Sequence, residues 1–585
     1  MLKTARFKIS GLLPFLLFII FFSFRLTALD ADLPDYGKTG YQQVDEGSYS
    51  YLALNKMHYG VINPDFVNTE VMQYTAPHLR TNFLENLFAY LGLQILGDNY
   101  YGLRIGSFIC VLMDFALLFV LLKTLKTRYC LTENKVIWVI LFSLTADFMF
   151  TVASRVVEPS TYRMLFLELL LFIYIKIGNE KTYKCFLLGL VSVFSVFGIY
   201  ITNLFMVIGC FLALLYANWK KGKLQTLKSV LGFGCGGLIS LLCCNTYLWY
   251  FWHTDVVENS LRTIRNFSVY DEYQTVSVAR GLFTTLLHYF SNNFHLYNIA
   301  FLMLFLLSLP VILRAIKRTH DDVAFINLIL YSMFLLQTLY SEDFIQRKYI
   351  LIVPTEVCLI FIAYCLIKRN GIAHFIADKK KLPAIIYCLF CAFFCIGLLL
   401  YRTKLIEDGS RFDYIFADKA VILSVGTFLP LCIVLFMWRN LYKKELKNKY
   451  PILPVLFLII SVSTSLYMDL RYIYLNHTYN DRDTMIELGK MDMESPYIIG
   501  NYFLGFTLYN DYIPVVNYYE EMRQMLSENP EIFYFDYSMN FVSQEYLDYV
   551  MEGSEYQIVL YRNFDRTMKT LGCARNVALY RVEKR

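Results

Sequence analysis

Apolar runs of about 20 residues alternate with short polar segments from residue 9 to about residue 470. An α-helix needs about 20 apolar residues to cross the hydrocarbon core of a bilayer, because each residue adds about 1.5 Å. The pattern therefore predicts a polytopic α-helical membrane protein with about thirteen transmembrane helices. We place these helices at roughly 9–28, 103–124, 135–153, 160–178, 184–200, 201–218, 228–250, 295–314, 322–340, 348–367, 382–401, 419–438 and 451–470.

Lys and Arg gather in every second segment between these runs. The clusters are Lys3 to Lys8, Lys123 to Arg128, Lys176 to Lys181, Lys220 to Lys223, Arg314 to Arg318, Lys368 to Lys381 and Arg439 to Lys449. Positively charged loops stay in the cytoplasm, so the N-terminus is predicted inside and the segment after about residue 470 outside. The stretch 184–218 must then hold two short helices, since a single helix there would invert every later loop. The first run is interpreted as an anchor, because Thr27–Ala31 lacks a small-x-small cleavage site.

Three predicted outer segments are longer than a turn, namely 29–102, 251–294 and 471–585. We assign residues 1–470, which include the first two segments, to a membrane domain, and the last segment to an extracytoplasmic domain. The amphipathic stretch Phe83–Ile95 predicts a helix in the membrane interface, with a surface helix that packs on the bundle as the alternative.

The C-terminal segment mixes strand and helix patterns. Tyr497–Ile499 and Tyr556–Tyr561 are typical of strands, and Tyr518–Leu526 is typical of a helix, so a small α/β domain is predicted. Cys573 is the only cysteine in this segment, which excludes a disulfide within it. This favours a bacterial plasma membrane over a secretory compartment.

Composition supports the membrane class. Hydrophobic residues make up 57% of the 585 residues and charged residues 17%, and the mean hydropathy is +0.44. These values lie outside the range of ordinary soluble proteins. The net charge of +6 resides in the short loops, which leaves no basic tract for a nucleic acid.

The acidic pair Asp45-Glu46, in the run Asp45-Glu46-Gly47-Ser48-Tyr49, lies just beyond the first apolar segment. A carboxylate at this surface indicates chemistry on a lipid-borne substrate, although such pairs also occur on solvated loops. A sugar on a polyprenyl phosphate leaves from a weakly basic phosphate, so one base and some positive charge would suffice. Asp45 suits the base and Arg347 the positive charge. Neighbouring helical residues diverge by about 100°, so only one member of the pair is expected to act.

Several motifs resemble the start of GT-C glycosyltransferases, in particular dolichyl-phosphate-mannose protein mannosyltransferases and bacterial lipid A aminoarabinose transferases. The resemblance covers about residues 10–370 in pattern. The motifs are Arg25-Leu26, Asp45 to Tyr49, Pro77-His78-Leu79, Leu93 to Asp98, Leu103-Arg104-Ile105, Ser154 to Glu158 and Arg347 to Pro354. Two positions depart from the family pattern: Ala76-Pro77-His78 stands where Pro-Pro is usual, and Glu158 where Asp is common.

The resemblance implies an inverting transferase that takes its sugar from a polyprenyl-phosphate donor on the outer leaflet. By the same analogy Asp45 is the base and Glu46 supports the loop or the acceptor. Donor phosphate binding falls to Arg347, Lys348 and Arg104, metal or donor binding to Glu158, and acceptor or donor contact to His78 and Arg155.

Other functions stay open at this point. A polymerase or ligase of lipid-linked oligosaccharides would carry its essential residues in a large later loop, and a lipid or sugar transporter would show repeats and broken helices at mid-membrane. The need for a divalent metal, the sugar, and the acceptor, whether protein, lipid or wall polymer, are also left undecided by the residues.

Overall fold

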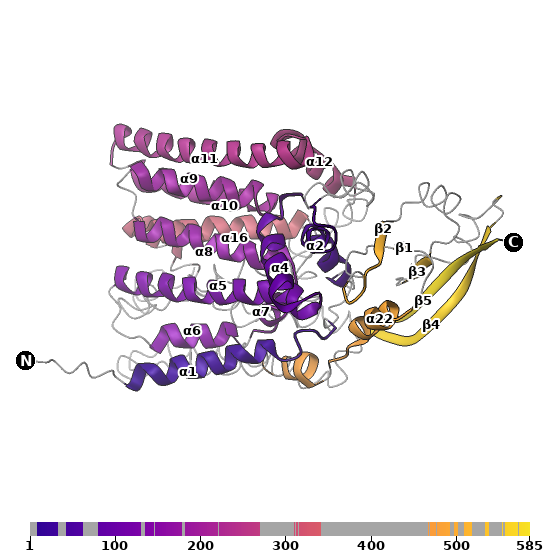
Figure 1. The fold of residues 1–585 in the computed structure, drawn as a ribbon. Coiled ribbons are helices and arrows are strands. Elements are labelled where there is room, and N and C mark those ends of the chain that lie inside the picture. The colour runs from indigo at the N-terminus through magenta and orange to yellow at the C-terminus, as the bar shows by residue number, and fades with distance from the viewer. Residues whose placement is uncertain are drawn as a thin grey trace, which may run out of the picture.

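The computed structural model describes part of the chain. The described residues are 9–32, 42–62, 80–129, 135–145, 147–177, 182–219, 221–269, 309, 312–313, 315–340, 466, 469–475, 477–491, 497–500, 508–516, 533–536, 553, 556–570 and 573–584. The helices are α1 (Ile9–Ser23), the 3-10 turn η1 (Phe24–Leu26), α2 (Gln42–Tyr59), α4 (Phe83–Leu96), α5 (Tyr100–Arg128), α6 (Lys135–Thr145), α7 (Phe148–Ala153), α8 (Pro159–Ile177), α9 (Thr182–Phe197), η4 (Ile201–Asn203), α10 (Leu204–Trp219), α11 (Lys223–Trp252), α12 (Val256–Val269), α16 (Asp322–Tyr340), the π-helical turn η9 (Leu470–Leu475) and α22 (Asn480–Gly489). Figure 1 shows the long helices stacked with near-parallel axes, while α2 and α4 lie across the end of the stack that faces the strands.

Two helices of the described part, α5 and α11, are long and apolar enough to cross a membrane. They coincide with the predicted spans at 103–124 and 228–250. Helices α8 and α16 likewise match the predicted runs at 160–178 and 322–340. The predicted spans at 295–314, 348–367, 382–401, 419–438 and 451–470 lie wholly or almost wholly outside the described residues, so the number thirteen stays a prediction.

The apolar stretch 184–218 divides into α9 and α10, as predicted. Asn203 lies at the division and is fully buried. Its Nδ2 donates to the Ser195 carbonyl at 2.8 Å, and its Oδ1 accepts from Nε of Arg163 at 3.2 Å. A helix break in an apolar environment must satisfy its polar groups internally, and Asn203 does so here.

The stretch 135–153, predicted as one helix, is instead divided into α6 and α7. The Asp147 carboxylate caps α7 by accepting from the Phe150 amide at 3.1 Å. At the end of α6, the Arg25 guanidinium donates to the Thr145 carbonyl at 2.7 Å and also to the Phe150 carbonyl at 3.0 Å. A cation from η1, directly after α1, therefore donates to carbonyls on both sides of the break.

Asp322, the first residue of α16, connects three helices at one end of the bundle. It forms an ion pair with Arg128 at the end of α5 and accepts from Tyr174 Oη of α8 at 3.1 Å. The sequence places all three helix ends on the cytoplasmic face, and the structure brings them together.

Close packing of α9 on α11 depends on small residues. A Cβ atom on Gly236 would lie 1.9 Å from the Phe186 carbonyl oxygen, and one on Gly189 would lie 2.0 Å from the Phe233 carbonyl oxygen. Neither backbone oxygen can move away without separating the helices. Small residues at such contacts let membrane helices approach closely.

The described strands are β1 (Tyr497–Gly500), β2 (Ile513–Val516), β3 (Phe533–Asp536), β4 (Tyr556–Thr570) and β5 (Cys573–Lys584). They form one sheet in the order β2-β1-β3-β5-β4. The pairs of β1 with β2 and β3 are parallel, whereas β5 runs antiparallel to β3 and β4. Strand β1 and the start of β4 coincide with the two predicted strands, and the predicted helix at 518–526 lies outside the described residues.

Candidate functional site

The segment between α1 and α2 is held by buried arginines. Nη1 of Arg155 donates to the carbonyls of Arg25 and Thr27 at 3.0 and 2.8 Å, and Nη2 donates to that of Ala28. Ala28 has a φ of 50°, a conformation unusual for a residue with a Cβ. The guanidinium of Arg155 thus gathers the carbonyls of a tight turn, and the residue is only 2% exposed.

Arg104 and Glu46 form a buried two-point ion pair beside this turn. Nε of Arg104 lies 2.8 Å from Oε1 of Glu46, and Nη2 lies 2.7 Å from Oε2. The side chains are 1% and 3% exposed. Nη1 of Arg104 donates to the carbonyls of Leu29 and Ala31 at 2.9 and 2.6 Å. The planar guanidinium, with its several fixed donors, therefore holds α2, α5 and the segment around Leu29–Ala31 in place relative to one another.

Glu46 has a further partner in the loop before α8. Its Oε1 accepts from the Val157 amide at 3.2 Å. The neighbouring Glu158 is 3% exposed. Three of the sequence motifs, those of Glu46, Arg104 and Glu158, therefore meet in one place, although they are far apart in the chain.

Asp45 lies in the first turn of α2, directly before Glu46. The helix is also fixed to α4, because the Asn86 amide donates to the Tyr49 carbonyl at 2.9 Å and accepts from the Ala53 amide at 3.0 Å. These two backbone groups are one helical turn apart. The position of the Asp45 backbone is therefore set by contacts from α4, α5 and the loop before α8.

A second acidic residue, Glu85 of α4, is fully buried near this site, and its carboxyl oxygens have no hydrogen-bond partner within the described part of the chain. Burial raises its pKa well above the ordinary value, the charge of Glu158 raises it further, and Arg163 opposes both. Burial thus favours the neutral, protonated form of the Glu85 carboxyl.

Helix α4 exposes apolar rather than polar side chains. Phe83, Leu87 and Leu91 are 41%, 38% and 46% exposed, whereas Glu85 and Asn86 are buried. The predicted interfacial helix therefore turns these apolar side chains outward and buries Glu85 and Asn86, of which Asn86 contacts α2. Neither polar residue was predicted from the sequence, where their signal is a pair of polar positions in a mostly apolar helix.

Three predicted site residues, His78, Arg347 and Lys348, lie outside the described residues. Among the residues that the structure does describe, no group of three His, Cys, Asp or Glu side chains is arranged to hold a metal ion. The metal or donor role of Glu158 therefore stays a prediction, as do the roles of the other residues.

No protein-family model and no curated protein sequence matches the chain. Solved structures do. ArnT from Cupriavidus metallidurans in the apo state matches over 97% of each chain, with 10% identity and a TM-score of 0.51. The same protein bound to undecaprenyl phosphate matches over 97% of this chain and 98% of its own, with 10% identity and a TM-score of 0.46.

The archaeal oligosaccharyltransferase AglB from Archaeoglobus fulgidus, in complex with an inhibitory peptide and a dolichol-phosphate, also matches. It covers 94% of this chain and 70% of its own, with 10% identity and a TM-score of 0.41. At this level of identity the likeness concerns the fold alone, and apo ArnT carries it. The chain has a polytopic membrane fold that resembles that of ArnT, a lipid A aminoarabinose transferase of the GT-C superfamily.

Proposed function

We propose that the chain is a membrane glycosyltransferase that moves a sugar from a polyprenyl-phosphate donor to an acceptor hydroxyl on the extracytoplasmic face. The observation that carries the proposal is the fixed start of α2, where Asp45 precedes a glutamate that Arg104 and the Val157 amide both hold. Catalysis by a general base requires such a fixed position. The ArnT-like fold supports the proposal.

The proposed topology has about thirteen spans, a cytoplasmic N-terminus and an extracytoplasmic C-terminus in a bacterial plasma membrane. Residues 1–470 form the membrane domain and residues 471–585 the outer domain. The acceptor, which is a protein, a lipid or a wall polymer, approaches from the outer side.

In the proposed reaction the Asp45 carboxylate takes the proton of the acceptor hydroxyl as its oxygen attacks the anomeric carbon. The bond between that carbon and the phosphate oxygen breaks, and the phosphate leaves with the electron pair, which inverts the anomeric centre. Phosphate is a weak base, so no general acid is needed. Arg347 and Lys348 neutralise the charge on the leaving phosphate.

The remaining residues have supporting roles in the proposal. Arg104 already donates four hydrogen bonds, to Glu46 and to two carbonyls, so its help to the phosphate is electrostatic. Arg155 shapes the turn that faces the donor or acceptor, His78 contacts either substrate, and Glu158 binds the donor or a divalent metal.

The test is sugar transfer by the purified full-length protein in lipid nanodiscs. Radiolabelled polyprenyl-phosphate sugars are offered with membrane acceptors to the wild type, to Asp45→Asn and to the control Asp511→Asn, which changes an exposed carboxylate of the outer residues. We expect Asp45→Asn to lose about a hundredfold in rate and the control to keep its rate.

Equal rates in both variants would remove Asp45 from the chemistry. Absence of turnover with every donor, together with protein-dependent movement of a lipid across the bilayer, would replace the transferase by a transporter.

A further inference from the structure

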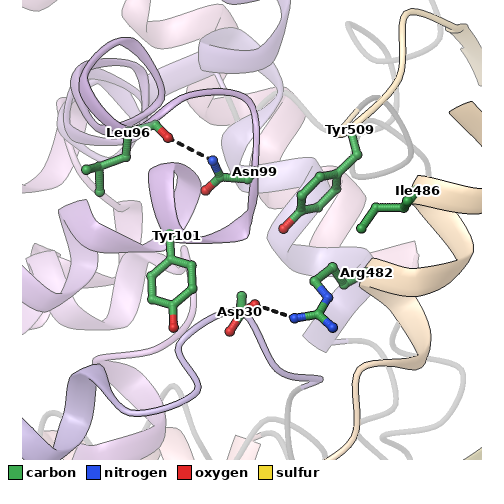
Figure 2. Close-up of a pocket in the computed structure, with 7 residues that line it drawn as sticks. All are labelled: Asp30, Leu96, Asn99, Tyr101, Arg482, Ile486 and Tyr509. Atoms are coloured by element: carbon green, nitrogen blue, oxygen red, sulfur yellow. Dashed lines mark hydrogen bonds and ion pairs between the residues drawn. The ribbon is translucent and has the colours of Figure 1, made fainter.

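A cavity of about 500 Å³, open to the surface, lies between the membrane bundle and the C-terminal residues (Figure 2). Four parts of the chain meet around it: the segment after α1, the turn between α4 and α5 with the adjoining helix ends, α22, and the segment before β2. The lining residues are Asp30, Leu96, Asn99, Tyr101, Arg482, Ile486 and Tyr509. Its volume falls within the range of small-molecule sites, about 300–1,000 Å³.

One wall of the cavity is a fixed ion pair. Nη1 of Arg482 lies 2.7 Å from Oδ2 of Asp30, and Figure 2 shows both groups on the same side of the cavity. The guanidinium also lies 4.0 Å from the centre of the Tyr479 ring and contacts Asp483. Because these contacts hold the pair in place, it presents a hydrogen-bond acceptor and a donor side by side.

Apart from Asn99, the remaining lining is aromatic and apolar, and Tyr101 lies beside Asp30. Tyr101 is 39% exposed and Leu96 is 45% exposed. The Tyr509 hydroxyl accepts from the Tyr100 amide at 3.2 Å, which fixes the orientation of its ring. Ile486 completes the apolar surface. In Figure 2 the Tyr101 and Tyr509 side chains approach the cavity from different parts of the chain.

This combination matches the chemistry of a pyranose. A pyranose has an apolar face of C–H groups, which packs on aromatic and aliphatic side chains. Each of its hydroxyls can both donate and accept a hydrogen bond. Neighbouring hydroxyls can therefore donate to the Asp30 carboxylate and accept from the Arg482 guanidinium. Neither a lipid chain nor a free phosphate fits as well, because the first needs no ion pair and the second would face the Asp30 carboxylate.

The cavity is also coupled to the candidate site. Asp30 stands between Leu29 and Ala31, whose carbonyls Arg104 holds together with Glu46. A ligand on Asp30 would therefore be linked through the Arg104 guanidinium to α2, the helix that carries Asp45. The residues of α22 belong to the predicted outer segment, so the ligand would enter from the water side rather than from the bilayer.

We propose that this cavity binds a pyranose unit of the acceptor. The inference rests on the proposed transferase function and specifies its acceptor as one that contains a saccharide, whether free or attached to a lipid. The polyprenyl-linked donor would reach the Asp45 region from the membrane.

The experiment measures binding of methyl pyranosides and short oligosaccharides to the full-length protein in nanodiscs by saturation-transfer NMR. A free and a lipid-linked form of the best ligand distinguish the two sources. We expect saturable binding that weakens about tenfold in Tyr101→Ala. The control Tyr250→Ala, which removes another exposed tyrosine far from the cavity lining, should bind as the wild type does.

A second readout separates this inference from the proposed reaction. The KM for the acceptor should rise about tenfold in Tyr101→Ala, while donor hydrolysis without acceptor stays unchanged. Tyr101→Phe keeps the ring and should retain most of the binding, which guards against loss of folding in the alanine variant. Saturable pyranoside binding that weakens in Tyr101→Ala and not in Tyr250→Ala, but no turnover of any donor, would support the cavity as a pyranoside site and overturn the transferase. Transfer by a protein that binds no pyranoside, with equal KM in both alanine variants, would overturn the cavity and keep the transferase.

Discussion

Replacing Arg104 with methionine would leave the Glu46 carboxylate buried without its cation, at side-chain exposures of 1% and 3% in the wild-type pair. Removing one partner of a buried ion pair costs about 3–5 kcal/mol. The carbonyls of Leu29 and Ala31 would also lose their donor, at about 1 kcal/mol each. We therefore expect the free energy of unfolding to fall by about 5–7 kcal/mol, a large part of a typical stability.

The reverse change, Glu46→Leu, would leave the guanidinium uncompensated and should cost about 3–5 kcal/mol. The double variant with Arg104→Met removes both charges, so it should lose much less than the sum of the single losses. A coupling free energy of at least about 3 kcal/mol is expected between the two residues. Arg104→Lys keeps the charge but not the fork, and should fall between the wild type and the methionine variant.

The assay is denaturation in mixed detergent micelles, followed by circular dichroism and tryptophan fluorescence. Arg262→Met is the matched control, because its partner Glu258 is four residues away and the two side chains are 34% and 45% exposed. That variant should lose about 0.5 kcal/mol or less. Equal losses of stability in Arg104→Met and Arg262→Met would refute the assignment of Glu46 and Arg104 as a buried ion pair. Strict additivity of the two single losses in the double variant would refute it as well.

Three further variants test other parts of the structure. Gly236→Ala places a Cβ 1.9 Å from the Phe186 carbonyl oxygen and should lower the free energy of unfolding by about 3 kcal/mol. In the control Gly234→Ala the new Cβ enters open space, so this variant should be neutral or stabilising. Similar losses in both variants would contradict the contact between α9 and α11. Burial raises the pKa of Glu85, so the folded state holds its proton where the unfolded state has lost it, and stability declines as pH rises above about 4.5. Glu85→Gln should remove this decline, and an unchanged difference in melting temperature between about pH 5 and pH 8 would contradict it. Asp32→Ala removes the acceptor for two amides at the start of α22, at 2.7 and 2.9 Å, and should cost about 1 kcal/mol and speed hydrogen exchange there; unchanged protection would argue against the cap.

The division into transmembrane helices follows from local pattern. Apolar length alone predicts α5, α8, α11 and α16, and charge alternation predicts the division of 184–218 into two helices. The division between α6 and α7 is different. It depends on Arg25, which lies 120 residues before the Thr145 carbonyl that it satisfies, and no local pattern reports such a distant partner.

In the candidate site, too, the contacts between residues far apart in the chain could not be predicted from the sequence. Helical geometry predicts that only one of Asp45 and Glu46 acts as the base, which stays a prediction. Glu46 forms its ion pair with Arg104, which lies 58 residues later. The sequence could suggest positive charge near the site but not that Arg104 already serves a carboxylate and two carbonyls. Asn86 was missed because its amide bridges two backbone groups of α2, a role without a sequence pattern.

Two arginines, Arg25 and Arg155, hold the segment between α1 and α2 and also constrain the order in which the chain can assemble. Arg25 finds its carbonyl acceptors at Thr145 and Phe150, and Arg155 donates back to Arg25 across 130 residues. During synthesis the first helix therefore enters the membrane long before these partners exist. Until the chain has been extended past Arg155, the Arg25 side chain lacks these partners and remains in water or among lipid headgroups. The segment between α1 and α2 is thus synthesised early, but its contacts with Arg155 can form only after Arg155 has been made.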